Sequence, residues 1–310
     1  MMLKVFIDGQ AGTTGLKLKE RLLNRQDIAL LEIDSSLRKD PIAKQAIMDE
    51  ADVVFLCLPD DGAREAVKMV SDNTIVIDAS TAHRTTPGWA YGLPELSPKH
   101  RMDIANGKRI SVPGCHACGF SAMVYPLVSK GYLTTDAKIN CTSITGYSGG
   151  GKDLIQTYES SREPGDSLKS PRPYALNLTH KHLPEMMAVN GLVNPPHFYP
   201  IVGDMARGMV VTIHLWANQF TKPLNPKAVK DILSEHYRDA YYVRVMEPDT
   251  ENGFFDPTKC NDTNYLDISV YGHDNQIIVA ARLDNLGKGA SGAALQSMNI
   301  ACNVDERMGL

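Results

Sequence analysis

A glycine-rich turn directly after the first strand is the feature that most restricts the fold of this chain. The segment Lys4–Ile7 is typical of a strand and Thr14–Leu23 of a helix, and the residues between them carry glycines in the spacing G-x-x-G-x-x-G. Such glycines let the backbone approach a pyrophosphate closely, while the amides at a helix start hold negative charge. Tight turns also use glycine, but this position in a β-α unit favours a dinucleotide site. The residues assigned to that site are Gly9, Gly12, Thr13, Thr14 and Gly15.

The first 112 residues alternate short apolar runs with helical stretches. Strands are expected at Ala29–Ile33, Val53–Leu58 and Thr74–Ile77, with a helix at Ala63–Val70. Continuous Val, Ile and Leu strands linked by helices indicate a parallel sheet buried on both faces. The pattern predicts an α/β, doubly wound Rossmann half.

The pattern changes after residue 137, where the strands become longer and partly alternate apolar with polar residues. Runs of this kind indicate a mostly antiparallel sheet in a second, α+β domain. The helical segment Gly289–Val304 is expected to return to the first domain, and three prolines predict an irregular loop from Ser160 to Pro173 that could be a flap or an oligomer contact. We therefore expect domains at residues 1–114 with 288–310, and at 115–287. The longer strands are expected at Lys138–Thr145, Met209–Ala217, Asn264–Tyr271 and Gln276–Leu283.

Composition narrows the class of protein. The 310 residues are 43% hydrophobic and 22% charged, with a formal net charge of −4, as in an ordinary soluble globular protein. Without a basic cluster or a long apolar stretch, we expect no nucleic-acid partner and no membrane partner. The N-terminus lacks the pattern of a signal or transit peptide, and the six cysteines lack a disulfide-framework spacing, so a cytoplasmic location is expected.

The residues after the second strand bear on the choice of cofactor. Asp34 lies 19 residues after Gly15 and could accept a hydrogen bond from a ribose hydroxyl, which would favour NAD. The hydroxyls and cations that follow it would instead suit a ribose 2′-phosphate, although a solvated loop could carry the same residues. We expect NADP. The residues concerned are Ser35, Ser36, Arg38 and Lys39.

Cys115 follows Pro113-Gly114 and precedes the apolar segment Ser121–Tyr132, whose helical character places the thiol at the start of a helix. The macrodipole and unpaired amides at a helix start should lower the pKa of its thiol below the ~8.5 of an ordinary cysteine and make it a nucleophile. Alternatively, it could be a small buried residue, or could pair with Cys118 as a thiol-disulfide exchange motif.

Three further stretches could serve catalysis or hold an anion. Alternation in an extended segment would place the imidazoles of His180 and His182 on one side, where either could act as a base. Both histidines with Glu185 and Cys115 form a conceivable metal site, but the motif lacks a matching C-x-x-C pair, so no metal is expected. The turn at Ser148–Lys152 offers amides and a cation, and Arg207 precedes a strand, unless these are a hinge and a structural ion pair. The anion-binding candidates are Ser148, Gly149, Lys152 and Arg207.

Taken together, these motifs resemble the N-acetyl-gamma-glutamyl-phosphate reductase family of arginine biosynthesis, in its shorter variety. The resemblance spans nearly the whole chain, and the order of the motifs makes it specific. The matching segments are Gly9–Gly15, Asp78–Arg84, Tyr91–Glu95, Pro113–Cys115, Ser148–Lys152, His180–Glu185 and Asn285–Gly292.

The resemblance implies a Rossmann domain followed by a glyceraldehyde-phosphate-dehydrogenase-like catalytic and oligomerisation domain, in a homodimer or homotetramer. It implies that Cys115 attacks the acyl phosphate and that NADPH reduces the thioester. It further implies that one histidine, preferably His182, is the acid/base. Arg207 would hold substrate, and Ser80 and Asn285 would lie near the cofactor.

The neighbourhood of Cys115 departs from the family pattern. His116 stands where the family usually has an aromatic residue, and Cys118 stands where a small hydroxyl residue is expected. Cys118 could form a reversible disulfide with Cys115 under oxidation. The alternatives are a related reductase acting on an aspartyl or aminoadipyl phosphate, a thiol-disulfide redox protein, and a non-catalytic dinucleotide sensor.

Overall fold

The computed structural model describes residues 2–38, 40–160 and 166–310, and the chain divides into two compact units. The first unit comprises residues 1–113 and 290–310, and the second comprises residues 114–289. The domain boundaries expected from the sequence, at 114/115 and 287/288, lie close to the divisions at 113/114 and 289/290. Lys39 and part of the proline-rich loop lie outside the described residues.

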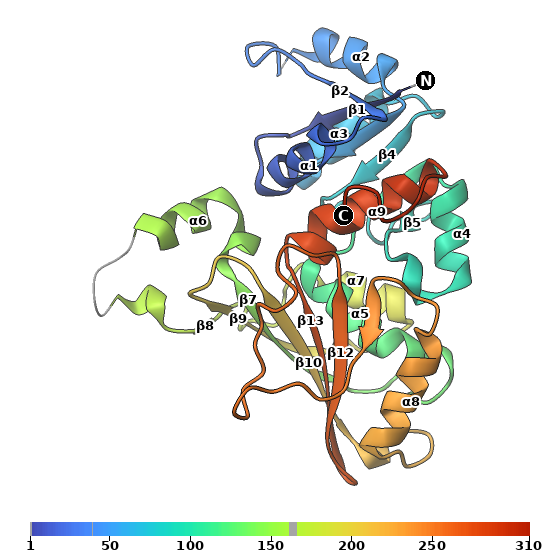
Figure 1. Cartoon of the computed structure of the whole chain (residues 1–310), viewed down its shortest axis with the longest axis vertical. Helices are drawn as coiled ribbons and strands as arrows, with labels where there is room; N and C mark the ends of the chain where they lie inside the picture. The colour runs from blue at the N-terminus through green and yellow to red at the C-terminus, as the bar shows by residue number, and fades with distance from the viewer. Residues whose placement is uncertain (1, 39, 161–165) are drawn as a thin grey trace. The chain divides into compact units, whose positions relative to one another are not determined.

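The first unit contains a fully parallel six-stranded sheet in the order β2-β1-β3-β4-β6-β5 (Figure 1). The chain leaves β1 towards β2 and returns to the other side of β1 through β3, which creates a topological switch point where α/β sheets bind ligands. The doubly wound prediction is confirmed. Its strands are β1 (Leu3–Asp8), β2 (Ile28–Leu31), β3 (Val53–Leu56), β4 (Ile75–Asp78), β5 (Ala90–Tyr91) and β6 (Arg109–Ser111).

Helices cover both faces of this sheet, because alternate strand residues bury themselves in two separate cores. Val5 and Ile7 pack with residues of α1, α4 and α9, whereas Phe6 between them packs with residues of α2 and α3. The C-terminal helix α9 thus returns to the first unit, as expected. The helices are α1 (Thr13–Leu23), α2 (Pro41–Glu50), α3 (Asp60–Met69), α4 (Pro98–Asn106) and α9 (Gly292–Ala301).

The second unit is built on a seven-stranded sheet in the order β11-β12-β13-β10-β7-β9-β8. Four of its neighbouring pairs are antiparallel, and β11-β12 and β7-β9 are parallel, so the prediction of a mostly antiparallel sheet is confirmed. The strands are β7 (Asn140–Gly146), β8 (Arg172–Pro173), β9 (His197–Gly203), β10 (Met209–Trp216), β11 (Val243–Val245), β12 (Leu266–His273) and β13 (Gln276–Leu283). The helices are α5 (Cys115–Ser129), α6 (Gly151–Ser160), α7 (Leu183–Asn190) and α8 (Pro226–His236).

The two faces of this sheet differ in their environment. On one face α5 lies so close to β10 that a Cβ on Gly119 would come within 2.8 Å of Val211 Cγ2. On the opposite face Ile144, Tyr199 and Ile278 are each about two-fifths exposed (41%, 42% and 39%). This second, partly apolar side is called the open face below.

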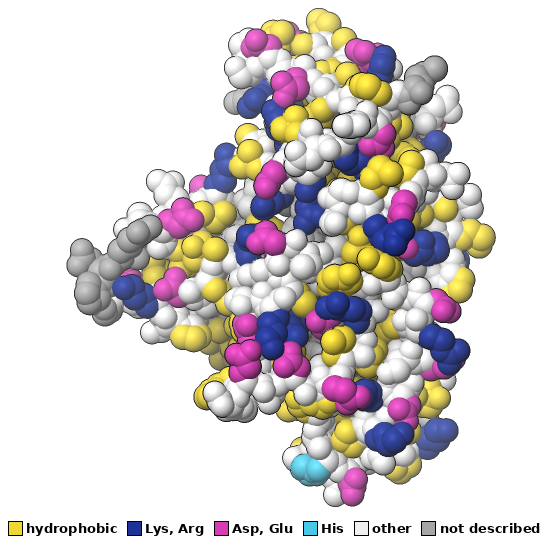
Figure 2. Space-filling model, viewed as in Figure 1, with side chains coloured by type: hydrophobic (Ala, Val, Ile, Leu, Met, Phe, Trp, Pro, Cys, Tyr) yellow, Lys and Arg dark blue, Asp and Glu magenta, His cyan; other side chains and the backbone are white. Residues whose placement is uncertain are grey.

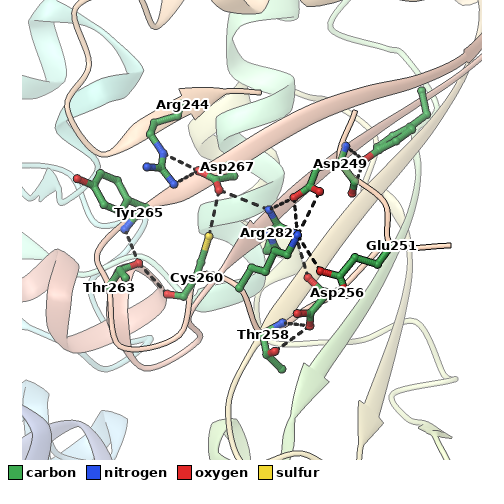
Figure 3. Close-up of polar contacts among 12 residues, drawn as sticks. Arg244, Asp249, Glu251, Asp256, Thr258, Cys260, Thr263, Tyr265, Asp267 and Arg282 are labelled. Atoms are coloured by element: carbon green, nitrogen blue, oxygen red, sulfur yellow. Dashed lines mark hydrogen bonds and ion pairs between the residues drawn. The ribbon is translucent and has the colours of Figure 1, made fainter. Parts of the chain in front are cut away.

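A polar network covers the open face over β12 and β13 (Figure 3). Asp267 and Arg282 are register partners on these strands, and both are buried. Asp267 accepts a hydrogen bond from Arg244 Nε at 2.7 Å. The Arg282 guanidinium lies 3.3 Å from the carboxylate of Asp249, in the loop between β11 and β12. Cys260 donates to the Asp267 carboxylate at 3.4 Å, and burial together with that carboxylate raises the pKa of the thiol to about 12. The network thereby fastens the long segment after β11 to the sheet.

We expect Asp267→Asn to lower the free energy of unfolding by about 3 kcal/mol, because two arginines would lose a buried carboxylate. Urea denaturation followed by circular dichroism measures this change. Lys227→Ala is the matched control, since it breaks an exposed pair with Asp231 and should cost no more than about 0.5 kcal/mol. Equal effects of the two variants would contradict a structural role for the network.

Candidate active site

Cys115 is the first residue of α5, as the sequence predicts. The first bond of the helix runs from Cys118 N to Gly114 O at 2.8 Å, so Cys115 lies in the turn whose amides precede the intrahelical ladder. The side chain is partly buried. These amides can stabilise negative charge on the sulfur or on an acyl oxygen bound to it.

The Glu185 carboxylate, from α7, forms a hydrogen bond with Gly114, the residue before Cys115. Glu185 is buried, and its Oε1 accepts from Gly114 N at 2.8 Å. Because Glu185 lies in the first turn of α7, it connects the start of α7 to the start of α5.

His182 immediately precedes α7 and lies beside the cysteine. A ring nitrogen of His182, one of His116 and the Sγ atom of Cys115 all lie within 4.8 Å of one another. The expected extended segment is wrong, because His182 has helical backbone angles and α7 begins directly after it at Leu183, with Pro184 in its first turn. The two imidazoles still meet, with His180 and His182 edge to face at 4.8 Å between ring centroids.

His180 and His182 have different surroundings. His180 Nδ1 accepts from the backbone amide of His182 at 3.1 Å, which fixes the turn that carries His182. This contact connects His180 to the turn that carries His182, and a ring nitrogen of His182 belongs to the cluster with the Cys115 sulfur.

His116 lies in the centre of the same cluster. Burial, and then the neighbouring charges of His180 and Lys181, lower the pKa of His116 to about 3, so the ring is neutral. Its nitrogens make hydrogen bonds with Ser143 Oγ at 2.8 Å and the Tyr174 hydroxyl at 2.9 Å. Burial and the nearby Cys115 sulfur raise the pKa of Tyr174, which keeps that hydroxyl protonated.

The segment after β13 lies directly against Cys115. A Cβ on Gly289 would lie 2.7 Å from Cys115 Cβ, so the bare glycine backbone is required beside the nucleophile. Asn285 is buried, donates to Ser148 Oγ at 2.9 Å and accepts from Gly208 N at 3.0 Å. Asn285 therefore joins the Ser148 turn to the start of β10.

The anion-binding candidates prove to be in structured surroundings. Ser148 and Gly149 lie in a 3₁₀ turn (Tyr147–Gly150) rather than in a flexible turn, and Lys152 is exposed on α6. Arg207 forms an ion pair with both carboxylate oxygens of Asp262 and lies 3.4 Å from Asp284. That Arg207 holds the substrate stays a prediction, because a substrate anion would compete with Asp262 and Asp284 for the guanidinium.

In the first unit the glycine turn fits a dinucleotide phosphate. Gly9 has a φ of +86°, and a Cβ there would lie 2.3 Å from Cys57 O at the end of β3. A Cβ on Gly15 would lie 2.5 Å from Gly9 O. Helix α1 begins after Gly12, which has no side chain to cap it, and the buried Thr13 hydroxyl has no hydrogen-bond partner among the described residues. A phosphate oxygen would satisfy both the hydroxyl and the helix amides.

The other cofactor candidates of this unit lie at the carboxyl ends of its strands. Asp34, Ser35, Ser36 and Arg38 are exposed after β2. Two hydrogen bonds from Ser36, with a smaller effect of Arg38, lower the pKa of Asp34. Ser80, after β4, is buried and donates to Asp78 Oδ2 at 2.7 Å.

Comparison with known proteins places the chain among the semialdehyde dehydrogenases. A family model described as the semialdehyde dehydrogenase dimerisation domain matches residues 115–285, more than half of the chain, and the NAD-binding domain model matches residues 30–104. An N-acetyl-gamma-glutamyl-phosphate reductase 2 from Nostoc is 43% identical, covering 99% of both chains. A reductase of the same name from Chelativorans is 41% identical, covering 97% of this chain and 98% of its own. The chain belongs to the N-acetyl-gamma-glutamyl-phosphate reductase family.

Solved structures show that this reductase family shares its fold with more distant enzymes. Aspartate semialdehyde dehydrogenase II from Vibrio cholerae has a TM-score of 0.75 at 15% identity, covering 98% of this chain and 99% of that one. The Candida albicans aspartate semialdehyde dehydrogenase, solved with NADP, has a TM-score of 0.62 at 16% identity, covering 97% and 98%. The predicted combination of a Rossmann domain with a dehydrogenase-like second domain is confirmed.

Proposed function

We propose that this protein reduces N-acetyl-gamma-glutamyl phosphate to N-acetylglutamate 5-semialdehyde and releases phosphate, a step of arginine biosynthesis. The observation that carries the proposal is the convergence of the Cys115 sulfur and a His182 nitrogen at the start of α5 in a member of this family. A thiol, a proton carrier and unpaired helix amides are the groups that acyl transfer through a thioester requires.

The residues of the second unit would divide the chemistry as follows. His182 takes the proton of Cys115, and the thiolate attacks the acyl carbon, expelling phosphate and leaving a thioester. The amides at the start of α5 stabilise the oxyanion of this step. After reduction His182 protonates the developing alkoxide, then removes that proton as the thiolate leaves and the aldehyde forms.

NADPH bound at the glycine turn would supply the hydride for the reduction. Gly9, Gly12, Thr13, Thr14 and Gly15 would hold its pyrophosphate. Ser35, Ser36 and Arg38 would bind the 2′-phosphate. We propose that Ser80 and Asn285 also bind the cofactor. We propose that Ser148, Gly149, Lys152 and Arg207 bind the substrate.

Steady-state kinetics with three acyl phosphates tests the substrate. We expect the highest kcat/KM with N-acetylglutamyl phosphate and NADPH, and lower values with aspartyl or aminoadipyl phosphates and with NADH. Turnover confined to aspartyl or aminoadipyl phosphate would reassign the substrate, and failure to reduce any of the three would refute the reductase proposal.

We further propose that the protein forms a homo-oligomer through the open face. Ile144, Tyr199 and Ile278 present an apolar surface, and the family model covering this unit is described as a dimerisation domain. Lysine and arginine are interspersed with acidic side chains on the face drawn in Figure 2. Among the described residues, no helix combines the length and apolar character needed to cross a bilayer. The described cysteines are free thiols. We propose a cytoplasmic location, a reducing compartment that suits free thiols.

Ile144→Lys is expected to convert the dimer or tetramer into smaller species, because a charge would be buried at the centre of the interface. Size-exclusion chromatography with light scattering measures the mass. Leu23→Lys places the same charge on a 63%-exposed leucine of α1 and should leave the mass unchanged. Assemblies of identical mass for both variants and the parent would place the interface elsewhere.

A further inference from the structure

The mechanism leaves one buried group beside the nucleophile unused. His116 lies 5.4 Å from His182, between ring centroids, and 5.1 Å from Phe198, and its ring is held by Ser143 and Tyr174. A residue kept for apolar packing alone would need neither nitrogen. Ser143 and Tyr174 therefore hold a polar imidazole beside the Cys115 sulfur, and imidazole is a common ligand of transition metals.

The donor atoms around it suit a soft divalent cation. One thiol sulfur and two imidazole nitrogens lie within 4.8 Å of one another. In a tetrahedral zinc site, bonds of about 2.3 Å to sulfur and 2.0–2.1 Å to nitrogen set the ligands roughly 3.3–3.8 Å apart. Side-chain movements of about 1 Å would therefore bring the three donors into range. Sulfur with imidazole is the set that zinc prefers, and carboxylate-preferring magnesium or calcium would not suit it.

Neighbouring contacts determine which residues supply the ligands. The Glu185 carboxylate is engaged with Gly114 N, and His180 Nδ1 with the His182 amide. The set conceivable from the sequence combined Cys115 with His180, His182 and Glu185, whereas the donor atoms that lie within 4.8 Å of one another are those of Cys115, His116 and His182. To bind a cation, His116 would exchange one of its two hydrogen bonds, to Ser143 or to Tyr174, for the metal, and the other partner would orient the ring.

We propose that Cys115, His116 and His182 form a binding site for a soft divalent cation such as Zn²⁺, with a fourth position open to water. The cation would occupy the sulfur and the imidazole that acyl transfer needs, so binding would reversibly block turnover. The binding itself does not rest on the proposed function; only the inhibition does.

The test uses the full-length protein, treated with chelator and then titrated with Zn²⁺ or Co²⁺ without substrate. One equivalent of Zn²⁺ should slow iodoacetamide alkylation of Cys115, mapped by mass spectrometry, by at least about 10-fold, and excess chelator should restore the rate. Co²⁺ should give a thiolate-to-metal charge-transfer band that is absent in Cys115→Ser. An unchanged alkylation rate in the parent protein would overturn the proposal without any variant.

Variants distinguish the ligands. His116→Phe should weaken Zn²⁺ binding, measured by competition with a chromophoric chelator, by about 100-fold or more, because a ligand is lost. His214→Gln removes an imidazole from the open face and should leave the affinity unchanged. Equal affinities of His116→Phe and the parent, or a loss confined to His180→Gln, would overturn the assignment. Because these measurements omit the acyl phosphate, they can fail while the reductase assay succeeds, and the reverse.

Discussion

Replacing Cys115 by serine is expected to lower kcat by about 10⁴-fold or more, because the hydroxyl is a poor nucleophile at neutral pH and cannot form the thioester. NADPH oxidation in the presence of N-acetylglutamyl phosphate measures the loss. The fold should persist, since serine preserves the size of the side chain and α5 is fixed elsewhere through Gly119 and Val211.

Two measurements make this result specific. Cys302→Ser changes another partly buried thiol, whose pKa burial raises to about 11, and should retain full activity. In the absence of NADPH, the parent protein should gain the mass of the acyl group on Cys115 after mixing with substrate. Acylation of Cys115→Ser to the same extent, or substantial turnover by it, would contradict covalent catalysis at this residue.

His182→Gln is expected to lower kcat by about 10²–10⁴-fold, the typical contribution of a general acid/base. Its pH-rate profile should also lose the limb that reports the imidazole, a change that a purely structural defect would not produce. His214→Gln is the matched control on an exposed histidine and should behave as the parent.

The neighbouring His180 provides the comparison that could contradict this assignment. His180→Gln should lower kcat less and retain the pH limb, since His180 orients the turn through the His182 amide. If the limb disappears in His180→Gln and persists in His182→Gln, the two roles must be exchanged.

The fold was predictable where local pattern and tertiary environment agree. Residues 53–56 and 75–77 are apolar at every position because both faces of the parallel sheet are buried, and this signal does not depend on distant residues. The start of α5 at Cys115 follows from the Pro-Gly pair before it.

The arrangement of the site was only partly predictable. The sequence places His116 next to Cys115, but its contacts with Ser143 and Tyr174 join segments 27 and 58 residues away, which no local pattern encodes. The extended segment at His180 was wrong because α7 begins at Leu183 directly after the turn, with Pro184 tolerated in its first turn. The need for glycine at position 289 likewise comes from a close approach to Cys115 that only the folded chain reveals.

Through the hydrogen bond between Glu185 and Gly114, the short helix α7 controls the distance between the Cys115 sulfur and the His182 imidazole. The first turn of α7 follows His182 and carries the Glu185 carboxylate, which accepts a hydrogen bond from the Gly114 amide before Cys115. Heat or substitution that loosens the eight residues Leu183–Asn190 would therefore silence catalysis while the sheets remain intact, so loss of activity should precede melting.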